Sequence, residues 1–319
     1  MKKVIVITGP TAVGKTKCSI EIARKLKTDI INADAYQIYK KMDIGTAKPN
    51  IEEQSLVKHH LIDIVEPTCC FSVADYQKIV REKIEELWHE NKVPLLVGGS
   101  GLYLDSVISN YEFGGQTHDS NFDEKYQNYT NSELHEQLEK LDINMANSIH
   151  QNNRKRVLRA LEILESGQTK GQKKNELIYD ALVIYLNDDR EKLYNRINLR
   201  VDKMINDGLL DEVKYLFSNN LFSKTSIAAI GYKELIPYFL GDIELTDAIL
   251  KIKQASRNYA KRQLTWFNHK NYTSTVLIDE NNFNNTIDEV YALIEKFLAV
   301  EERWFSFLGP LNKLGVLKE

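Results

Sequence analysis

The residues best suited to chemistry follow a short apolar run at the start of the chain. They form a glycine-rich loop with the spacing G-x-x-x-x-G-K-[S/T], namely Gly9, Pro10, Thr11, Ala12, Val13, Gly14, Lys15 and Thr16. In this pattern the glycines let successive backbone N–H groups converge on an anion at the start of a helix. Lys15 adds a positive charge, and Thr16 offers a hydroxyl to a magnesium ion. The pattern predicts a diphosphate or triphosphate ligand and by itself does not specify ATP.

A second polar group follows the next apolar run and consists of Asp34, Ala35, Tyr36 and Gln37. In an open α/β sheet, ligands bind at the carboxyl ends of the strands, so Asp34 should face whatever the glycine-rich loop holds. Its carboxylate could take a proton from a nucleophile or bind Mg2+ through water, and its position also suits a helix cap. Gln37 can both donate and accept hydrogen bonds, as recognition of a base edge requires.

Glycines also cluster after a later apolar run, in the segment Gly98, Gly99, Ser100, Gly101. Such a segment lets backbone or a small hydroxyl approach a ligand closely, and Ser100 is the side chain there that can donate a hydrogen bond. A tight turn between a strand and a helix would need the same glycines, so this motif alone leaves both interpretations open.

The elements that must position these residues alternate between strand and helix. Short apolar runs at 4–8, 30–33, 94–97, 181–186 and 275–278 are typical of strands buried on both faces of a parallel sheet. Ser72 and Asp75 form a capping box before a helical pattern. We therefore predict an α/β fold, a P-loop NTPase-like doubly wound parallel sheet with a helix-rich C-terminal half. Residues 1–110 and 176–319 would form the catalytic core, and 111–175 an inserted helical domain.

Composition places the chain among ordinary globular proteins. Its 319 residues are 43% hydrophobic and 27% charged, with a net charge of −3. No apolar run approaches the roughly 20 residues of a membrane span, and the first strand leaves no room for a signal peptide. Three cysteines form neither a disulfide framework nor a metal pair. We expect a cytoplasmic protein with free thiols and no membrane partner.

Positive charge is concentrated in two helical stretches. Residues 251–272 contain no acidic residue and carry Lys251, Lys253, Arg257, Lys261, Arg262 and Lys270. A second cluster consists of Arg154, Lys155, Arg156 and Arg159. Local basic faces on a mildly acidic protein suit a partner with several phosphates, although solvated helix faces would have the same composition.

Eight segments in order resemble the tRNA dimethylallyltransferases, which belong to the isopentenyltransferase family of prenyl transferases. They are GPTAVGKT, DAYQIYKKMDIGTAKP, HHLID, VGGSGLY, KRVLRALE, RINLRVDKMINDGLLDEV, IGYKE and YAKRQLTW, and they span nearly the whole chain. The resemblance implies transfer of a dimethylallyl group from dimethylallyl diphosphate to N6 of the adenine 3′ of the tRNA anticodon, with diphosphate released. It also implies Mg2+ as cofactor and the tRNA anticodon stem-loop as partner, and we expect a monomer.

The resemblance further assigns roles to individual residues. Asp34 would be the general base, Lys15 and Thr16 would act on the diphosphate and Mg2+, and Arg200 would be a further diphosphate ligand. Ser100 stands where the family usually has threonine, Ala35 where it has serine, and Lys125 where it has an arginine in the insertion. Residues assigned to tRNA binding are Asp34, Ala35, Tyr36, Gln37, Ser100, Lys125, Lys155, Arg156, Arg159, Arg257 and Lys261. Arg257, Lys261 and Arg262 could instead turn inward to the diphosphate.

Three other functions share part of this pattern. An adenylate isopentenyltransferase, which prenylates free nucleotides, would have the same loop and base, but the basic helix in the insertion favours tRNA. A small-molecule kinase would account for the first 100 residues and leave IGYKE and YAKRQLTW without a role. A tRNA-binding protein without catalysis would not need Lys15, Thr16 and Asp34 together. The lack of a C-terminal cysteine–histidine zinc module indicates an enzyme of bacterial type.

Overall fold

The computed structural model describes residues 1–113, 120–167 and 173–307. In these ranges six strands form one sheet in the order β3-β2-β4-β1-β7-β8, and every neighbouring pair is parallel. The strands are β1 Lys3–Thr8, β2 Ile30–Asn32, β3 His59–His60, β4 Leu95–Val97, β7 Asp180–Asn187 and β8 Thr273–Leu277. All five predicted strands are present. The two-residue β3 was missed because it is too short to show an apolar period.

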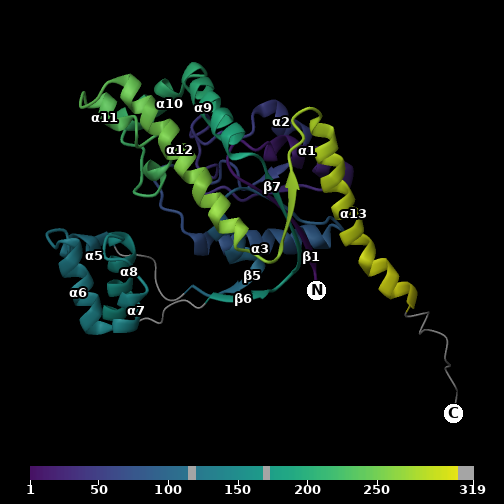
Figure 1. Cartoon of the computed structure of the whole chain (residues 1–319), viewed down its shortest axis with the longest axis horizontal. Helices are drawn as coiled ribbons and strands as arrows, with labels where there is room; N and C mark the ends of the chain where they lie inside the picture. Colours follow the sequence, from purple (N-terminus) through teal and green to yellow (C-terminus); the bar gives the residue numbers. More distant parts are fainter. Residues whose placement is uncertain (114–119, 168–172, 308–319) are drawn as a thin grey trace, which may run out of the picture. The chain divides into compact units, whose positions relative to one another are not determined.

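Helices cover both faces of this sheet (Figure 1). The helices are α1 Lys15–Leu26, α2 Ile51–Leu56, α3 Val73–His89, α4 Gly101–Ile108, α9 Arg190–Asn206, α10 Leu209–Ser218, α11 Ile236–Phe239, α12 Leu245–Asn268 and α13 Phe283–Phe307. Alternate residues of β1 point to opposite faces, as the period of a strand requires. Val4 and Val6 pack in the cluster that includes α3, α4 and α10, whereas Ile5 and Ile7 pack with α1 and α13. This two-sided burial confirms the doubly wound arrangement.

Local capping explains where several of these helices begin. The predicted capping box at α3 is present, because Ser72 accepts from the Asp75 N–H and Asp75 accepts from the Ser72 N–H. Asn50 and Glu53 form a second capping box at α2. Each box satisfies backbone donors that the first turn of a helix leaves unpaired.

The chain divides into two compact units. Unit 1 comprises residues 1–108 and 177–319, and unit 2 comprises 109–176, bounds that differ by one or two residues from the predicted ones. Unit 2 contains α5 Ser120–Lys125, α6 Asn131–Leu141, α7 Ile143–Asn147 and α8 Arg154–Glu165 around a separate apolar cluster. Residues 114–119, 168–172 and 308–319 lie outside the described ranges.

One expectation for the insertion was wrong. We interpreted 111–175 as a helical insertion without strands, but β5 Ser109–Tyr111 and β6 Lys173–Leu177 form a two-stranded sheet at the ends of this segment. The sequence of β6, KKNEL, has no apolar alternation. A strand in an isolated pair need not bury a face in a core, so hydrophobic periodicity does not reveal it.

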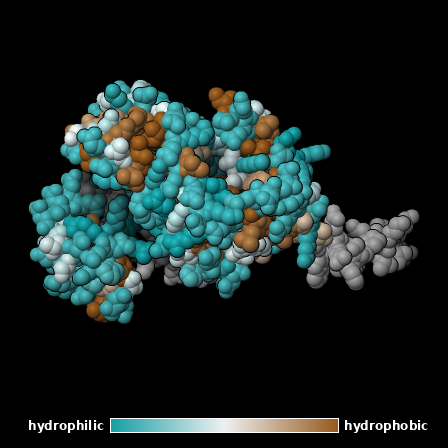
Figure 2. All heavy atoms as spheres, turned by 45° about the horizontal axis from the view of Figure 1, so that its top comes forward, coloured by the Kyte–Doolittle hydropathy of each residue, from teal (hydrophilic) through white to brown (hydrophobic). Residues whose placement is uncertain are grey.

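The face of the molecule that Figure 2 shows is mainly hydrophilic. On this face, hydrophobic residues form small separate patches between charged and polar ones (Figure 2). None of the helices in the described ranges is both long and apolar enough to cross a bilayer.

Candidate active site

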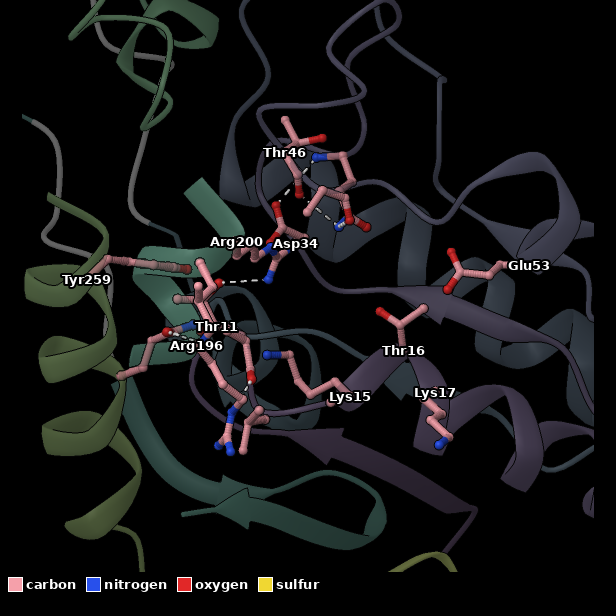
Figure 3. Close-up of a pocket in the computed structure, with 18 residues that line it drawn as sticks. Thr11, Lys15, Thr16, Lys17, Asp34, Thr46, Glu53, Arg196, Arg200 and Tyr259 are labelled. Carbon is pink, nitrogen blue, oxygen red and sulfur yellow. Dashed lines mark hydrogen bonds between the residues drawn. The ribbon is translucent and has the colours of Figure 1, made fainter. Parts of the chain in front are cut away.

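A cavity of about 550 Å3 lies at the carboxyl ends of β1 and β2, within unit 1. It brings together the glycine-rich loop, the segment after β2, and side chains from α9 and α12 (Figure 3). Its lining residues are Thr11, Ala12, Val13, Gly14, Lys15, Thr16, Lys17, Asp34, Gln37, Thr46, Ala47, Glu53, Gly99, Arg196, Leu199, Arg200, Tyr259 and Gln263. This position agrees with the rule that open α/β sheets bind ligands at the carboxyl edge.

The backbone of the glycine-rich loop needs its two glycines. Gly14 has a φ of 99° and immediately precedes α1, a conformation that L residues rarely adopt. A Cβ at Gly9 would lie 2.4 Å from the carbonyl oxygen of Leu186, so β7 excludes any larger residue there. The loop therefore curls tightly against the end of β7 and directs the start of α1 toward the cavity.

Lys15 is held inside this loop. Its ammonium group donates hydrogen bonds to the carbonyl oxygens of Gly9 and Pro10, at 2.9 and 2.7 Å. Burial lowers the pKa of Lys15 to about 7; the positive charge of Arg200 lowers it further, and the negative charge of Asp34 partly opposes both effects. An anion bound in the loop would favour the charged form of this side chain.

Asp34 lies opposite Lys15, and Figure 3 shows both side chains pointing into the same space. Its Oδ1 accepts hydrogen bonds from the N–H groups of Tyr36 and Gln37, at 2.9 and 3.4 Å. The carboxylate thus caps the following turn and faces the cavity at the same time. Burial raises the pKa of Asp34, while those two N–H groups, Lys15 and Arg200 act in the opposite direction. A desolvated carboxylate of this kind is a stronger base than an exposed one.

Two arginines from α9 complete the positive side of the cavity. Arg200 donates to Thr11 Oγ1 at 3.1 Å, and burial lowers the pKa of its guanidinium. Arg196, one turn earlier, donates to the carbonyl oxygen of Ala12 at 3.2 Å and pairs with Asp188 and Glu280. Arg200 was predicted as a diphosphate ligand and Arg196 was missed. Their four-residue spacing puts both on one helix face, a signal that the sequence contained.

Gln263 from α12 connects two of the loops that the sequence had singled out. Its Oε1 accepts from the Thr11 N–H at 2.9 Å, and its Nε2 donates to the carbonyl oxygen of Gly99 at 2.9 Å. The residue is 4% exposed. It was not predicted, and neither was Tyr259, one helical turn earlier on the same wall of the cavity.

Gln37 and Ser100, from the segments that follow β2 and β4, form hydrogen bonds to backbone groups. Gln37 lines it, but its Nε2 donates to the carbonyl oxygens of Thr46 and Ala47, at 3.2 and 3.1 Å. Ser100 Oγ accepts from the Ala35 N–H at 3.2 Å. Among the described residues that line the cavity, neither Ser100 nor Ala35 nor Tyr36 occurs.

The basic residues predicted on α12 do not line the cavity either. Arg257 donates to Asn198 and Gln254, at 2.6 and 2.8 Å, and Arg262 lies over the ring of Tyr259. Lys261 is exposed. The alternative in which these three turn inward to a diphosphate therefore does not agree with the geometry.

The four basic residues of unit 2 that were predicted to bind tRNA fall into two groups. Lys155 and Arg156 on α8 are exposed, opposite the buried Val157 and Leu161. Arg159 pairs with Glu162 at 2.6 Å, and Lys125 pairs with Glu165 and lies over the ring of Tyr126. Helix α8 is thus amphipathic, with Lys155 and Arg156 exposed, Val157 and Leu161 buried, and Arg159 engaged with Glu162.

A much smaller cavity, about 50 Å3, adjoins Lys15, Thr16, Asn32 and Asp34. Its oxygen-bearing side chains suit a hard cation such as Mg2+ that keeps several waters. In the described ranges no cluster of three or more His, Cys, Asp or Glu residues forms a metal cage of its own. A metal here would therefore need oxygen ligands from water and from the bound phosphates.

Comparison with known proteins gives a consistent result. Residues 37–270 match the family model described as IPP transferase. The chain is 51% identical to tRNA dimethylallyltransferases of Bacillus velezensis and Bacillus subtilis, over 84% of this chain and 88% of each relative.

Solved structures agree with these relatives. A full-length tRNA isopentenylpyrophosphate transferase from Bacillus halodurans is 39% identical, with a TM-score of 0.75 over 96% of this chain and all of that one. A eukaryotic dimethylallyltransferase acting on tRNA is 28% identical, with a TM-score of 0.79 over 94% of this chain and 80% of that one. These matches confirm the P-loop NTPase-like fold class. The chain belongs to the IPP transferase family, the family of the tRNA dimethylallyltransferases.

Proposed function

We propose that this enzyme transfers a dimethylallyl group from dimethylallyl diphosphate to N6 of the adenine immediately 3′ of the tRNA anticodon. One observation carries the proposal: the cations Lys15 and Arg200 face the desolvated carboxylate of Asp34 across a single cavity. A leaving diphosphate needs the positive side and an attacking amine needs the negative side. The relatives named tRNA dimethylallyltransferase support the same reaction.

The positive side stabilises the leaving group. As the bond between C1 of the dimethylallyl group and the diphosphate oxygen breaks, negative charge develops on the diphosphate. Lys15, Arg200 and the N–H groups at the start of α1 are fixed in advance where that charge appears, so they lower the barrier electrostatically. Lys15 would exchange its hydrogen bonds to the loop carbonyls for bonds to phosphate oxygens.

Mg2+ fits this arrangement as a cofactor. Thr16 would offer its hydroxyl to the ion, and Asp34 would contact it through water, in the small cavity that both side chains line. When bound, the ion would supply further positive charge to the diphosphate oxygens.

Asp34 would act as the general base. The lone pair of the adenine N6 is delocalised into the ring, so the amine attacks C1 effectively only as it loses a proton. The N6 lone pair forms the new N–C bond, the N6 proton passes to the Asp34 carboxylate, and diphosphate leaves with the electrons of the C–O bond. Such proton transfer typically contributes about 100- to 10,000-fold to a rate.

The tRNA would supply its adenine by base flipping. Removing the base from its stack costs a few kcal/mol, which contacts from Gln37 would offset. The exposed Lys155 and Arg156 would contact the phosphate backbone, which positions the RNA without reading its sequence. The cytoplasmic location and the monomeric state remain predictions.

The test compares Asp34→Asn with the wild type, using dimethylallyl diphosphate, Mg2+ and unmodified tRNA. Asparagine can still accept the N–H groups of Tyr36 and Gln37, so the turn stays capped, but it cannot take the proton. We expect turnover to fall about 100- to 10,000-fold, with tRNA binding largely unchanged. Near-normal turnover would contradict the assignment of Asp34 as the general base.

Two control substrates separate the other functions. AMP in place of tRNA should not be prenylated at a comparable rate, and comparable rates would favour an adenylate isopentenyltransferase. ATP should not be hydrolysed or used for phosphoryl transfer, and either activity would favour a kinase.

A further inference from the structure

The residues Asp43, Ile44, Gly45, Thr46 and Ala47 form a segment that we call the 43–47 loop. Thr46 and Ala47 line the cavity, and their carbonyl oxygens accept the two hydrogen bonds from Gln37 Nε2. The orientation of the Gln37 amide therefore depends on where this loop lies. Nothing in the chemistry proposed above accounts for what holds the loop itself.

Glu212 on α10 holds the loop through its backbone. Its Oε2 accepts from the N–H groups of Asp43 and Ile44, both at 2.9 Å, and its Oε1 accepts from the Gly45 N–H at 3.1 Å. Three successive N–H groups thus converge on one carboxylate, a concave arrangement that favours an anion. Charge-assisted hydrogen bonds of this kind are stronger than neutral ones.

Tyr232, from the IGYKE segment, fixes the carboxylate in turn. Its hydroxyl donates to Glu212 Oε1 at 2.6 Å, and its side chain is fully buried. A Cβ at Gly45 would lie 2.4 Å from the ring of Tyr232, so the loop backbone packs directly on the ring. This explains why glycine follows Ile44 and gives IGYKE a role.

The residue after the loop is anchored as well. Lys48 donates to the carbonyl oxygen of Tyr39 at 2.8 Å and pairs with the carboxylates of Asp43 and Asp63. Its side chain is 3% exposed. The loop is therefore held on one side by Glu212 and on the other by Lys48.

We infer that Glu212 is a positioning residue for recognition of the acceptor base. It holds the 43–47 loop, the loop carbonyls orient the Gln37 amide, and Gln37 presents its remaining hydrogen-bonding capacity to the adenine. The inference rests on the proposed function, in which Gln37 contacts the flipped base. It predicts that Glu212 affects the acceptor and not the diphosphate, because in the described ranges no hydrogen bond joins the 43–47 loop, Gln37, Glu212 or Tyr232 to the glycine-rich loop.

The test measures Glu212→Gln, Gln37→Ala and the double variant with tRNA and dimethylallyl diphosphate. A glutamine amide would direct a donor at the backbone N–H groups, so the loop should lose its fixed position. We expect kcat/KM for tRNA to fall roughly tenfold in Glu212→Gln, and KM for dimethylallyl diphosphate to stay within about twofold. In the Gln37→Ala background the same change should have little further effect. If the fold losses in kcat/KM of the two single variants multiply in the double variant, the inference is overturned.

A binding assay keeps this test independent of catalysis. Anticodon stem-loops carrying adenine or unsubstituted purine at the target position are compared by fluorescence anisotropy. Wild type should prefer adenine, and Glu212→Gln should lose most of that preference. Equal preference in both proteins overturns the role of Glu212, whereas a wild type that binds selectively but does not prenylate overturns the proposed reaction instead.

Two further variants address folding. Tyr232→Phe removes only the hydroxyl that fixes Glu212, so it should give a smaller loss of preference in the same direction even if Glu212→Gln folds poorly. Glu66→Gln is the matched control, because Glu66 is an exposed glutamate that pairs with the surface Lys40. A loss of preference in Glu66→Gln equal to that in Glu212→Gln would contradict the inference.

Discussion

Lys15 and Asp34 are both shifted toward their neutral forms by burial. Each faces a group that would restore its charge: an incoming diphosphate favours protonated Lys15, and Lys15 and Arg200 favour ionised Asp34. Because the two side chains share one cavity, their charges support each other before any substrate arrives. Burial still dominates in the free enzyme, so the pKa of Lys15 is about 7 and the pKa of Asp34 is raised, and a bound diphosphate would restore the charge of Lys15.

The lowered pKa of Lys15 predicts that diphosphate binding takes up protons. In the free protein the pKa of Lys15 is about 7, so above that pH Lys15 is mostly neutral until an anion restores its proton. Affinity should fall as pH rises above 7, by up to about tenfold per pH unit. Calorimetry at pH 8.5 in buffers of different ionisation enthalpy should show an uptake approaching one proton from this group.

Lys15→Arg is the matched control for this measurement. A guanidinium stays protonated over the whole range, so the variant should lack that uptake even if it binds more weakly. Proton exchange by the diphosphate itself is common to both proteins and cancels in the difference. Equal uptake in the two proteins would contradict the pKa of Lys15.

At the scale of elements, helices distant in sequence hold the loops of the cavity in place. α9 contributes Arg196 and Arg200, α10 contributes Glu212, and α12 contributes Tyr259 and Gln263. α12 packs against α9 (Figure 1). Rigid helices fix side chains more accurately than the loops that they support, which is what preorganised stabilisation of a leaving group requires.

Gln263→Met should disconnect two of these loops. Methionine has a similar length but leaves the Thr11 N–H and the Gly99 carbonyl without their partner. A buried unsatisfied group costs about 1–3 kcal/mol, so urea unfolding should show a loss of that order. Calorimetric affinity for diphosphate should also fall, because Thr11 belongs to the glycine-rich loop.

The control for this variant is Gln254→Met on the same helix, where the side chain is exposed and bonds to Asn258 and Arg257. It should change neither stability nor diphosphate affinity appreciably. If Gln263→Met resembles it in both measurements, Gln263 does not hold the loop.

At the scale of the whole molecule, the residues proposed for the chemistry all belong to unit 1. Unit 2 has an apolar cluster of its own, formed by Leu134, Leu138, Val157 and Leu161 among others. The exposed basic residues of α8 belong to unit 2. This division agrees with separate tasks, in which unit 1 carries out the reaction and unit 2 binds the phosphate backbone of the tRNA.

The double variant Lys155→Ala, Arg156→Ala should weaken binding of all tRNAs to a similar extent. Phosphate contacts carry no sequence information, and each one lost should reduce the slope of log K against log salt concentration by about 1. Filter binding between 50 and 200 mM salt, roughly the range over which such slopes are measured, gives both quantities. Lys140→Ala on α6, also exposed, is the control, and an equal effect there would indicate diffuse attraction instead of a contact on α8.

Much of the fold could be predicted because its signals are local. The apolar runs of the five predicted strands, the capping box at Ser72 and the spacing of the glycine-rich loop each lie within a few residues. The same holds for the position of Asp34, because strand order after such a loop is strongly restricted. Short or polar strands, namely β3, β5 and β6, were missed because they carry no period.

The sequence by itself determined which anion-binding loop this chain has, which carboxylate follows the neighbouring strand, and, through its motifs, the family. Only the tertiary structure decided which distant side chains complete the site. Gln263 meets Thr11 across 252 positions, and Glu212 meets the backbone of residues 43–45 across 167 to 169. Spacing along a chain reports on neighbours within a turn or a strand. α10 and α12 reach these loops only because apolar residues pack on both faces of the sheet and bring the helices to its edge.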